Sequence, residues 1–206
     1  MKPEVAALIL AAGQSRRMGK FKPLLPFGPK TVIESCIENL RDASVREIII
    51  VVGHRADEVR KHLNSNDVEF ALNDDPHSEM GASIAHGIER LSNDARAVMI
   101  SLVDQPAVDS VTIKQIIEAW KVGAALVQPQ HKGRGGHPVL IDLKFKDALL
   151  NLDPQTGLRG FFDEHRGEIL QLTVESSFVA RDMDTWEDYL RLHQDVFGYS
   201  PHRDLP

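Results

Sequence analysis

The feature that most constrains the fold is the alternation of short apolar runs with segments in which apolar residues recur every three or four positions. Short, almost continuous apolar runs are typical of strands that helices cover on both faces. The runs are Val5–Leu10, Glu47–Val52, Val68–Leu72, Ala97–Val103 and Ala124–Val127, and the helical segments are Thr31–Arg41, Ala56–Leu63, Gly81–Leu91 and Ser110–Trp120. This pattern predicts an α/β fold, a Rossmann-like three-layer sandwich around a mostly parallel sheet.

The pattern changes after Pro129. Gln130–Gly136 is a turn-rich, basic stretch, and His137–Ile141 resumes as a strand that we expect to pair antiparallel with its predecessor. A helix at Leu158–His165, a strand at Glu168–Val174 and a helix at Thr185–Phe197 are expected to follow. The second half therefore predicts a mixed sheet with an antiparallel excursion.

Length and charge limit the classes of protein to which the chain can belong. Its 206 residues predict a single domain over 1–206, with a frayed tail at 198–206. Lys and Arg number 24 against 30 Asp and Glu, a net charge of −6 that argues against nucleic-acid binding. No apolar run approaches the ~20 residues that span a bilayer, and no secretory signal is present, so we expect no membrane contact and a cytoplasmic protein.

A basic loop with glycines follows the first predicted strand directly. Residues 11–23 carry four cations although the protein is acidic overall. Glycine and alanine let backbone N–H groups approach phosphate oxygens at the carboxyl ends of parallel strands. Arg17 can donate to two phosphate oxygens, and Lys22 supplies a movable point charge. The loop therefore predicts a polyphosphate site; the alternative is a solvated basic loop without a ligand.

Two common nucleotide motifs do not fit this loop. A Walker A loop has four residues between its glycines and Ser or Thr after Gly-Lys, whereas five residues separate Gly13 from Gly19, and Phe21 follows Lys20. A dinucleotide fingerprint needs a second glycine where Ser15 stands. The loop therefore belongs to another class of phosphate-binding sequence.

Four motifs in the same order give the chain a specific resemblance. They are Leu10-Ala11-Ala12-Gly13-x-Ser15-x-Arg17-Met18-Gly19-x-x-Lys22-x-Leu24-Leu25-Pro26, Asp104-Gln105-Pro106, Gly136-His137-Pro138-Val139-Leu140 and Asp182-Met183-Asp184-Thr185. Together they resemble the nucleotidyltransferase family that includes the molybdopterin cytidylyl- and guanylyltransferases. The resemblance implies that the nucleotide is bound by Leu10, Ala11, Ala12, Gly13 and Ser15. It also implies that Arg17 and Lys22 face the phosphates of the NTP. The two alanines before Gly13 resemble the sequence of the cytidylyltransferase branch of this family.

Acidic residues at two positions are candidates to hold Mg²⁺. Asp104 follows a buried strand, where a carboxylate is costly unless a cation or donors meet it, and Mg²⁺ is bound by carboxylates together with substrate phosphates. The alternative is that Asp104 caps the turn before Pro106. Asp182 and Asp184 lie on one side of an extended segment, and the resemblance implies that one of them completes the metal site. We favour Asp184, which could instead only support the helix cap at Thr185.

Three further residues are assigned to ligands. Gly81 and Ser83 open a predicted helix, and the resemblance implies that they contact the base; the alternative is capping and close packing. His137 follows two glycines and a basic segment, and we expect it to orient the phosphate of the acceptor.

The sequence thus predicts a Mg²⁺-dependent nucleotidyltransferase. It would transfer CMP from CTP to a phosphorylated acceptor such as the molybdopterin cofactor and release pyrophosphate, catalysed by Arg17, Lys22 and Asp104. The acceptor could instead be a sugar phosphate or an alditol phosphate. Two other classes stay open: an NTP-binding regulatory module, and a docking protein that uses the surface around Trp186–Phe197. Docking to a molybdoenzyme or a maturation partner is compatible with the resemblance.

Overall fold

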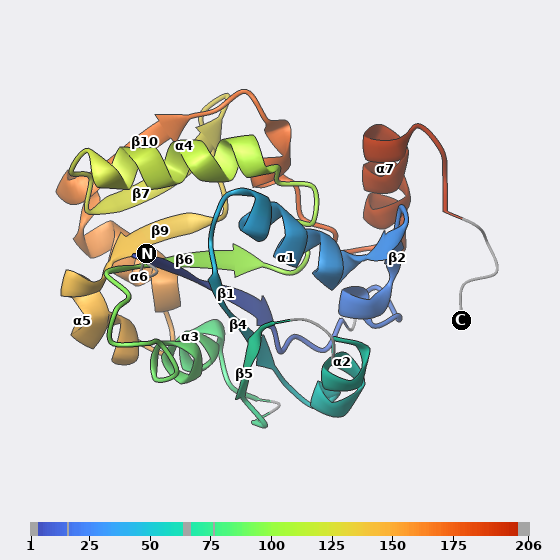
Figure 1. The fold of residues 1–206 in the computed structure, drawn as a ribbon, viewed down its shortest axis with the longest axis horizontal. Helices are drawn as coiled ribbons and strands as arrows, with labels where there is room; N and C mark the ends of the chain where they lie inside the picture. Colours follow the sequence, from blue (N-terminus) through green and yellow to red (C-terminus); the bar gives the residue numbers. More distant parts are fainter. Residues whose placement is uncertain (1–3, 16, 64–66, 76, 202–206) are drawn as a thin grey trace.

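The computed structural model describes residues 4–15, 17–63, 67–75 and 77–201 (Figure 1). Residues 202–206, the end of the tail predicted to be frayed, lie outside the described residues. The strands in the described part are β1 (Val5–Ala11), β2 (Pro26–Phe27), β3 (Lys30–Thr31), β4 (Glu47–Val52), β5 (Glu69–Leu72), β6 (Ala97–Leu102), β7 (Leu126–His131), β8 (Arg134–Gly135), β9 (Val139–Asp142) and β10 (Ile169–Thr173). One sheet has the order β10-β7-β9-β6-β1-β4-β5, with β8 paired to β7, and β2 and β3 form a separate hairpin.

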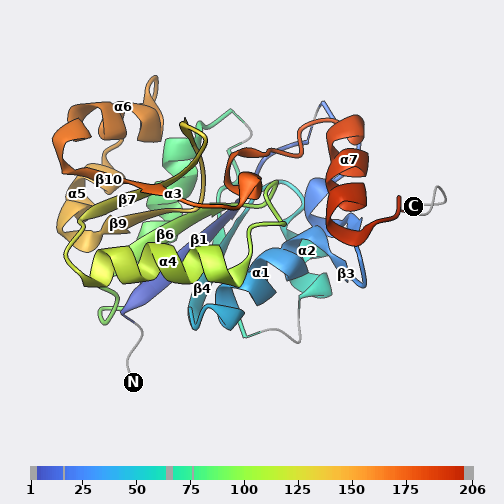
Figure 2. The ribbon, with the colours of Figure 1, turned by 90° about the horizontal axis from the view of Figure 1, so that it is seen from above.

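Helices cover both faces of this sheet, as the alternating pattern predicts. Figure 2 shows α1 (Val32–Asp42) and α4 (Ser110–Lys121) on one face, and α3 (Met80–Ile88), α5 (Lys146–Leu150) and α6 (Gly157–Glu164) on the other. The helix α2 (Ala56–His62) packs with the α1 and α4 layer, and α7 (Trp186–Phe197) lies beside the β2-β3 hairpin. In the part of the chain that the structure describes, no helix combines the length and the apolar character needed to cross a bilayer. The predicted three-layer fold is confirmed.

The sheet is mixed, as predicted, but its order was not foreseen. The strands β6, β1, β4 and β5 pair in parallel, as do β7 and β10. The strand β9 pairs antiparallel with its predecessor β7, as expected, and it also inserts between β7 and β6. The predicted strand Ala124–Val127 was wrong in its bounds, because β7 continues through Pro129 to His131. Proline removes only a donor, and the Pro129 carbonyl still accepts from the Gly136 N–H at 2.9 Å.

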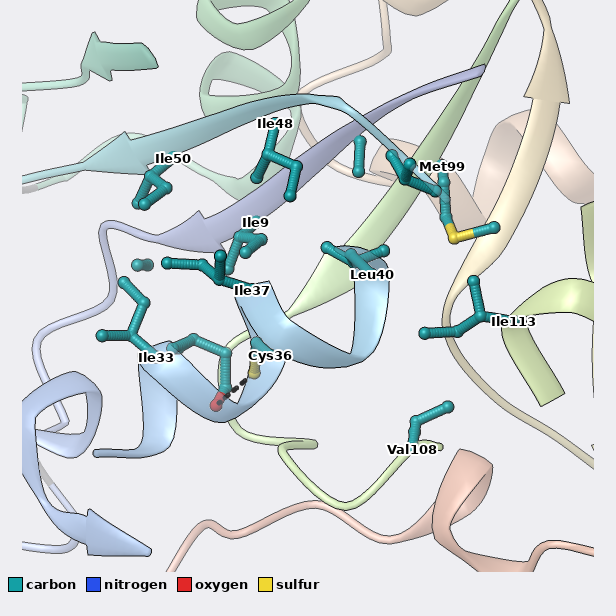
Figure 3. Packing of buried hydrophobic residues seen from close by; sticks show 14 of the residues in the cluster. Ile9, Ile33, Cys36, Ile37, Leu40, Ile48, Ile50, Met99, Val108 and Ile113 are labelled. Carbon is teal, nitrogen blue, oxygen red and sulfur yellow. Dashed lines mark hydrogen bonds between the residues drawn. The ribbon is translucent and has the colours of Figure 1, made fainter. Parts of the chain in front are cut away.

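Two apolar cores lie on opposite faces of the sheet. Along β4, Ile48 and Ile50 pack on the α1 and α4 side, whereas Ile49 and Val51 pack on the α3 side, which follows from the two-residue period of a strand. Figure 3 shows part of the first core, in which Ile50 and the other labelled residues are buried. Truncating a side chain such as Ile50 to alanine is expected to destabilise the fold by about 2–5 kcal/mol.

Side-chain caps fix where three helices begin. Thr31 and Glu34 form the predicted capping box of α1, and Asp109 accepts from the Thr112 N–H at the start of α4. Thr185 and Asp188 form a second capping box at α7. Because Thr185 immediately follows Asp184, this last cap also fixes the point where the chain leaves the candidate metal segment.

The helix α7 is fastened to the chain that follows the basic loop. The Tyr189 hydroxyl donates to the Pro26 carbonyl at 2.7 Å, and the Gly28 N–H donates to the imidazole of buried His193 at 3.3 Å. Since Nε2 of His193 accepts, the proton lies on Nδ1, which faces the Tyr199 carbonyl at 2.8 Å. Two segments that carry candidate site residues, near Lys22 and Asp184, are thereby held against the same helix.

Candidate active site

A cavity of about 570 Å³ opens where β1, β4, β5 and β6 end. These strands are parallel, so the loops that follow them meet at one edge of the sheet, which is where open α/β sheets bind ligands. Of the residues predicted to bind nucleotide or metal, those that line this cavity are Leu10, Ala12, Gly13, Ser15, Lys22, Ser83 and Asp104. Ala11 does not line it, because its side chain is buried at the end of β1.

The basic loop is shaped by hydrogen bonds around Ser15. The N–H groups of Met18 and Gly19 donate to the Ser15 carbonyl at 3.1 and 3.2 Å, and the Lys22 N–H lies 3.3 Å from the Ser15 hydroxyl. The Met18 side chain is buried in the core and anchors the loop. A Cβ placed on Gly13 would meet no atom within 4 Å. Packing therefore does not require this glycine, and the open space beside it lies at the cavity wall.

Lys22 lies between the two carboxylates that we predict to hold a metal ion, those of Asp104 and Asp184. Its side chain is buried, and Nζ lies 3.4 Å from Asp104 Oδ2 and 2.9 Å from Asp184 Oδ1. The guanidinium of Arg17, on an exposed side chain, lies 2.9 Å from Asp184 Oδ2. The fold thus brings together four candidate residues from three separate motifs.

Asp104 is held in an environment that disfavours its charge. Burial raises the pKa of its carboxyl group; Lys22 opposes this shift, and Asp182 and Asp184 add to it. Oδ1 of Asp104 is buried and has no hydrogen-bond partner within the described residues. Since its other oxygen faces Lys22, the side chain caps no turn there, and the capping alternative finds no support.

The two carboxylates form part of a site for a hard divalent cation. Within the described ranges, no group of three or more His, Cys, Asp or Glu is arranged to hold a metal ion by itself. In nucleotide sites, Mg²⁺ keeps several waters and is bound through one or two carboxylates together with substrate phosphates. Asp104 and Asp184 fit this mode of binding, and the orphaned Oδ1 of Asp104 is an oxygen that such a cation would satisfy.

The segment that carries Asp184 is tied to the end of β6. The Met183 N–H donates to the Asp104 carbonyl at 3.0 Å, and the Met183 side chain is fully buried. On one side of this bond, Asp182 accepts from the Gln105 side-chain amide at 2.7 Å. On the other side, Asp184 faces Lys22, so the two aspartates have different partners.

The region predicted to contact the base is organised by a residue that the sequence reasoning missed. Asn73, buried directly after β5, donates through Nδ2 to the hydroxyls of Ser83 and Ser78, each at 2.8 Å. It lines the cavity with Ser83, whereas Gly81 lines a second cavity. Its place at the end of a parallel strand, like that of Asp104, is the signal that could have found it.

The second cavity, of about 630 Å³, adjoins the first through Glu79 and Met80 and contains His137. Nδ1 of His137 lies 3.4 Å from the Ile100 carbonyl, which can only accept, so this nitrogen carries the proton. Burial lowers the pKa of His137, which favours the neutral ring with a free lone pair on Nε2.

Two arginines that no motif indicated also line the second cavity. Arg166 is paired with Asp163 at 2.8 Å, whereas Arg159 forms no hydrogen bond or ion pair among the residues that the structure describes. The side-chain amides of Gln171 and Gln128 also line this cavity, and the first donates to the second at 2.8 Å. Because Glu79 and Asp163 line it as well, the cavity offers charges of both signs, amide groups and one imidazole acceptor.

This fold and site define a nucleotide-binding α/β protein with paired carboxylates at the sheet edge. The chain belongs to the family described as the MobA-like NTP transferase domain, which matches residues 7–169. It is accordingly a nucleotidyltransferase of this family.

Relatives of known name span almost the whole chain. It is 27% identical over 199 residues to nicotine blue oxidoreductase from Paenarthrobacter nicotinovorans, covering 92% of this chain and 97% of that protein. It is 25% identical over 187 residues to molybdenum cofactor cytidylyltransferase from Escherichia coli K12, covering 90% of this chain and 94% of that protein. The crystal structure of Rv0371c from Mycobacterium tuberculosis matches with a TM-score of 0.84 at 26% identity, covering 94% and 100%. The crystal structure of the Rv0371c complex with manganese matches with a TM-score of 0.81 at 24% identity, and covers 94% of this chain and 100% of that chain. Because the two named enzymes belong to different reaction classes, family membership leaves the substrates open.

Proposed function

We propose that this chain transfers CMP from CTP to a phosphorylated acceptor of the molybdopterin type and releases pyrophosphate. The observation that carries the proposal is the position of Lys22: it lines the first cavity with Gly13 and Asp104, and its Nζ contacts both Asp104 and Asp184. The double alanine at 11–12 and the similarity to the Escherichia coli cytidylyltransferase support cytidine and the molybdopterin acceptor.

In this proposal the first cavity binds the nucleotide. The backbone around Gly13 and Ser15 receives the phosphates, and Arg17 and Lys22 turn from Asp184 toward them, because a triphosphate carries more negative charge than one carboxylate. Asn73 and Ser83 form the side facing the base. The Ser83 hydroxyl accepts from Asn73 Nδ2 and so keeps its own hydrogen to donate to the edge of a pyrimidine. Gly81 is placed on the acceptor side, because it lines the second cavity.

Asp104 and Asp184 would hold Mg²⁺ together with the triphosphate, and the ion would supply charge stabilisation at the α-phosphate and the leaving pyrophosphate. Their freedom to do so depends on Lys22, which leaves the carboxylates when it contacts the phosphates. The manganese complex of the Mycobacterium tuberculosis relative supports divalent-cation binding in proteins of this fold.

The second cavity binds the acceptor. Arg159, which forms no ion pair among the described residues, is suited to the acceptor phosphate. The neutral Nε2 of His137 accepts a hydrogen bond from a donor group on the ring system of the acceptor rather than from its phosphate. A phosphate monoester has a second pKa near ~6, so the nucleophile is ionised without a protein base. An acceptor oxygen forms a bond to the α-phosphorus while the bond to the bridging oxygen breaks, and pyrophosphate leaves with the electron pair.

Pyrophosphate release tests the proposal. Each of the four NTPs is incubated with Mg²⁺ and with molybdenum cofactor, a sugar 1-phosphate or an alditol phosphate. We expect release only with CTP and molybdenum cofactor, and release slower by about 100-fold or more from a Lys22→Met variant. Stabilisation by CTP in thermal unfolding, with no pyrophosphate from any acceptor, would instead identify a regulatory module. Oxidation or reduction of nicotine blue without any effect of NTP would indicate the reaction class in the name of the Paenarthrobacter relative.

A further inference from the structure

The chain reaches Asp184 through a short segment that must be held against β6 from a distant part of the sequence. Two hydrogen bonds hold it: the Met183 N–H donates to the Asp104 carbonyl at 3.0 Å, and Gln105 Nε2 donates to Asp182 Oδ1 at 2.7 Å. The first uses the backbone, which any residue supplies. The second requires a particular side chain at position 105, so Gln105 is the residue by which the sequence specifies this contact.

The orientation of the Gln105 amide follows from its partner. A carboxylate only accepts, so Nε2 faces Asp182, and this leaves Oε1 buried without a hydrogen-bond partner within the described residues. Burying a polar atom without a partner is unfavourable, and an apolar side chain of similar length would fill the same space without that penalty. Gln105 is 6% exposed, so its amide gains little from solvent. Packing alone therefore does not account for glutamine at this position, whereas donation to Asp182 does.

We propose that Gln105 is a positioning residue. Its hydrogen bond to Asp182, which we name the clasp, holds residues 182–184 against the end of β6 and so orients Asp184 toward the cation and the triphosphate. Asp182 accepts from the Gln105 amide, and of the two aspartates in this motif only Asp184 faces Lys22 and Arg17. This assignment rests on the proposed function, in which Asp184 helps to hold a divalent cation. The two aspartates of the motif then have different roles. Asp182 holds the segment against the end of β6, and Asp184 contacts the cation.

The first test replaces Gln105 by methionine and measures Mn²⁺ binding in the presence of CTP by electron paramagnetic resonance. Gln105→Met removes the donor and also the orphaned oxygen, so the unfolding temperature should change little while Mn²⁺ affinity falls about 10- to 100-fold, as is usual when a residue that orients a metal ligand is lost. The matched control is Gln115→Met on the exposed surface of α4, which should leave Mn²⁺ affinity unchanged.

The second test exchanges the two partners. Gln105→Glu places a carboxylate against Asp182, and we expect it to weaken Mn²⁺ binding at least as much as Gln105→Met. Adding Asp182→Asn restores the hydrogen bond in the reverse direction, because the amide at position 182 now donates to the carboxylate at position 105. The double variant should therefore regain most of the lost Mn²⁺ affinity. A role in packing alone would give no such recovery, because Asp182 is exposed.

The outcomes separate the clasp from the proposed function. If wild-type protein binds Mn²⁺ with CTP but Gln105→Met binds it equally well, the clasp is wrong and the proposed function stands. The same follows if the exchange of partners recovers nothing. If wild-type protein binds no Mn²⁺ with CTP, the assignment of Asp184 and the clasp both fail.

Discussion

The two cavities that adjoin at Glu79 and Met80 are built in different ways. The first takes much of its wall from one continuous loop after β1, with backbone hydrogen bonds around Ser15 and small residues at its rim. The second is assembled from side chains of β7, β9, β10 and α6. If the first cavity binds the nucleotide and the second the acceptor, as we propose, nucleotide binding depends on local backbone geometry, whereas acceptor choice depends on separate side chains that can vary one by one.

Their charges differ as well. In the first cavity and beside it, Lys22 and Arg17 are already paired with acidic partners, so a ligand must exchange with internal ion pairs. In the second, Arg159 forms no ion pair among the described residues, and Asp163, whose carboxylate it attracts, is already paired with Arg166. In the proposed function, Arg159 can therefore meet the acceptor without breaking an ion pair of its own. Substitutions in the first cavity should therefore change catalysis and cation binding together, whereas those in the second should change acceptor affinity alone.

The largest effect is expected for Lys22→Met. Loss of a charge that stabilises the transition state should lower kcat by about 100-fold or more. The same change frees Asp104 and Asp184, so Mn²⁺ without nucleotide should bind the variant more tightly than wild type and raise its unfolding temperature more. Electron paramagnetic resonance and thermal unfolding measure both, with Lys20→Met, an exposed lysine of the same loop, as the control. Unchanged turnover in Lys22→Met would remove this lysine from the mechanism.

Asp104→Asn should separate activity from stability. We expect kcat to fall about 30-fold, because a cation held by Asp184 alone stabilises the transition state less, by about 2 kcal/mol. Stability should move the other way. The folded pKa of Asp104 is raised, so its contribution to stability is present at low pH and is lost as pH rises through that pKa.

In protein without metal, Asp104→Asn should therefore be as stable as wild type or more stable at pH 7, with a difference that shrinks toward pH 3. Thermal unfolding across this pH range measures the difference. A variant that is clearly less stable at pH 7 would assign Asp104 a structural role.

The layers and the first cavity could be predicted because their determinants are local. Strand and helix periods place Val5–Ala11 and its parallel neighbours, and one loop carries Gly13, Ser15 and Lys22 in sequence. The insertion of β9 between β6 and β7 could not be predicted, because strand order depends on pairing between distant segments.

The second cavity was less predictable for the same reason. Arg159 is an exposed arginine on a short helix, and nothing in its neighbourhood of the sequence distinguishes it from a solvated surface residue. Gln105 was visible in the motif, but its task depends on Asp182, which lies 77 positions away. The assignment of His137 to the acceptor stays a prediction. Its tautomer depends on the Ile100 carbonyl and its lowered pKa on burial, and both follow from the folded structure rather than from neighbouring residues in the sequence.

A smaller effect is expected for Arg159→Gln. Loss of one charged contact to the acceptor phosphate, worth about 1.5 kcal/mol, should raise the KM for the acceptor roughly tenfold and leave the KM for CTP unchanged. Steady-state kinetics with molybdenum cofactor as the varied substrate measure this, and Arg191→Gln, on α7 outside both cavities, is the control. An equal rise in the KM for the acceptor and the KM for CTP would contradict the proposal that the second cavity binds only the acceptor.

The smallest effect, and the sharpest test of the loop, is expected for Gly13→Ala. The added Cβ meets no protein atom within 4 Å, so the unfolding temperature should not change. A bound phosphate would meet the methyl group, and displacement of one backbone contact by about 1 kcal/mol should weaken CTP binding roughly fivefold. Calorimetric titration with CTP and Mg²⁺ measures the loss. Gly133→Ala, in the β7-β8 turn, is a poor control because its φ is positive, whereas Gly167→Ala, which also has open space, is a suitable one. If Gly13→Ala binds CTP as wild type does, the phosphates do not approach the backbone here, and the nucleotide depends on Lys22 and Arg17 alone.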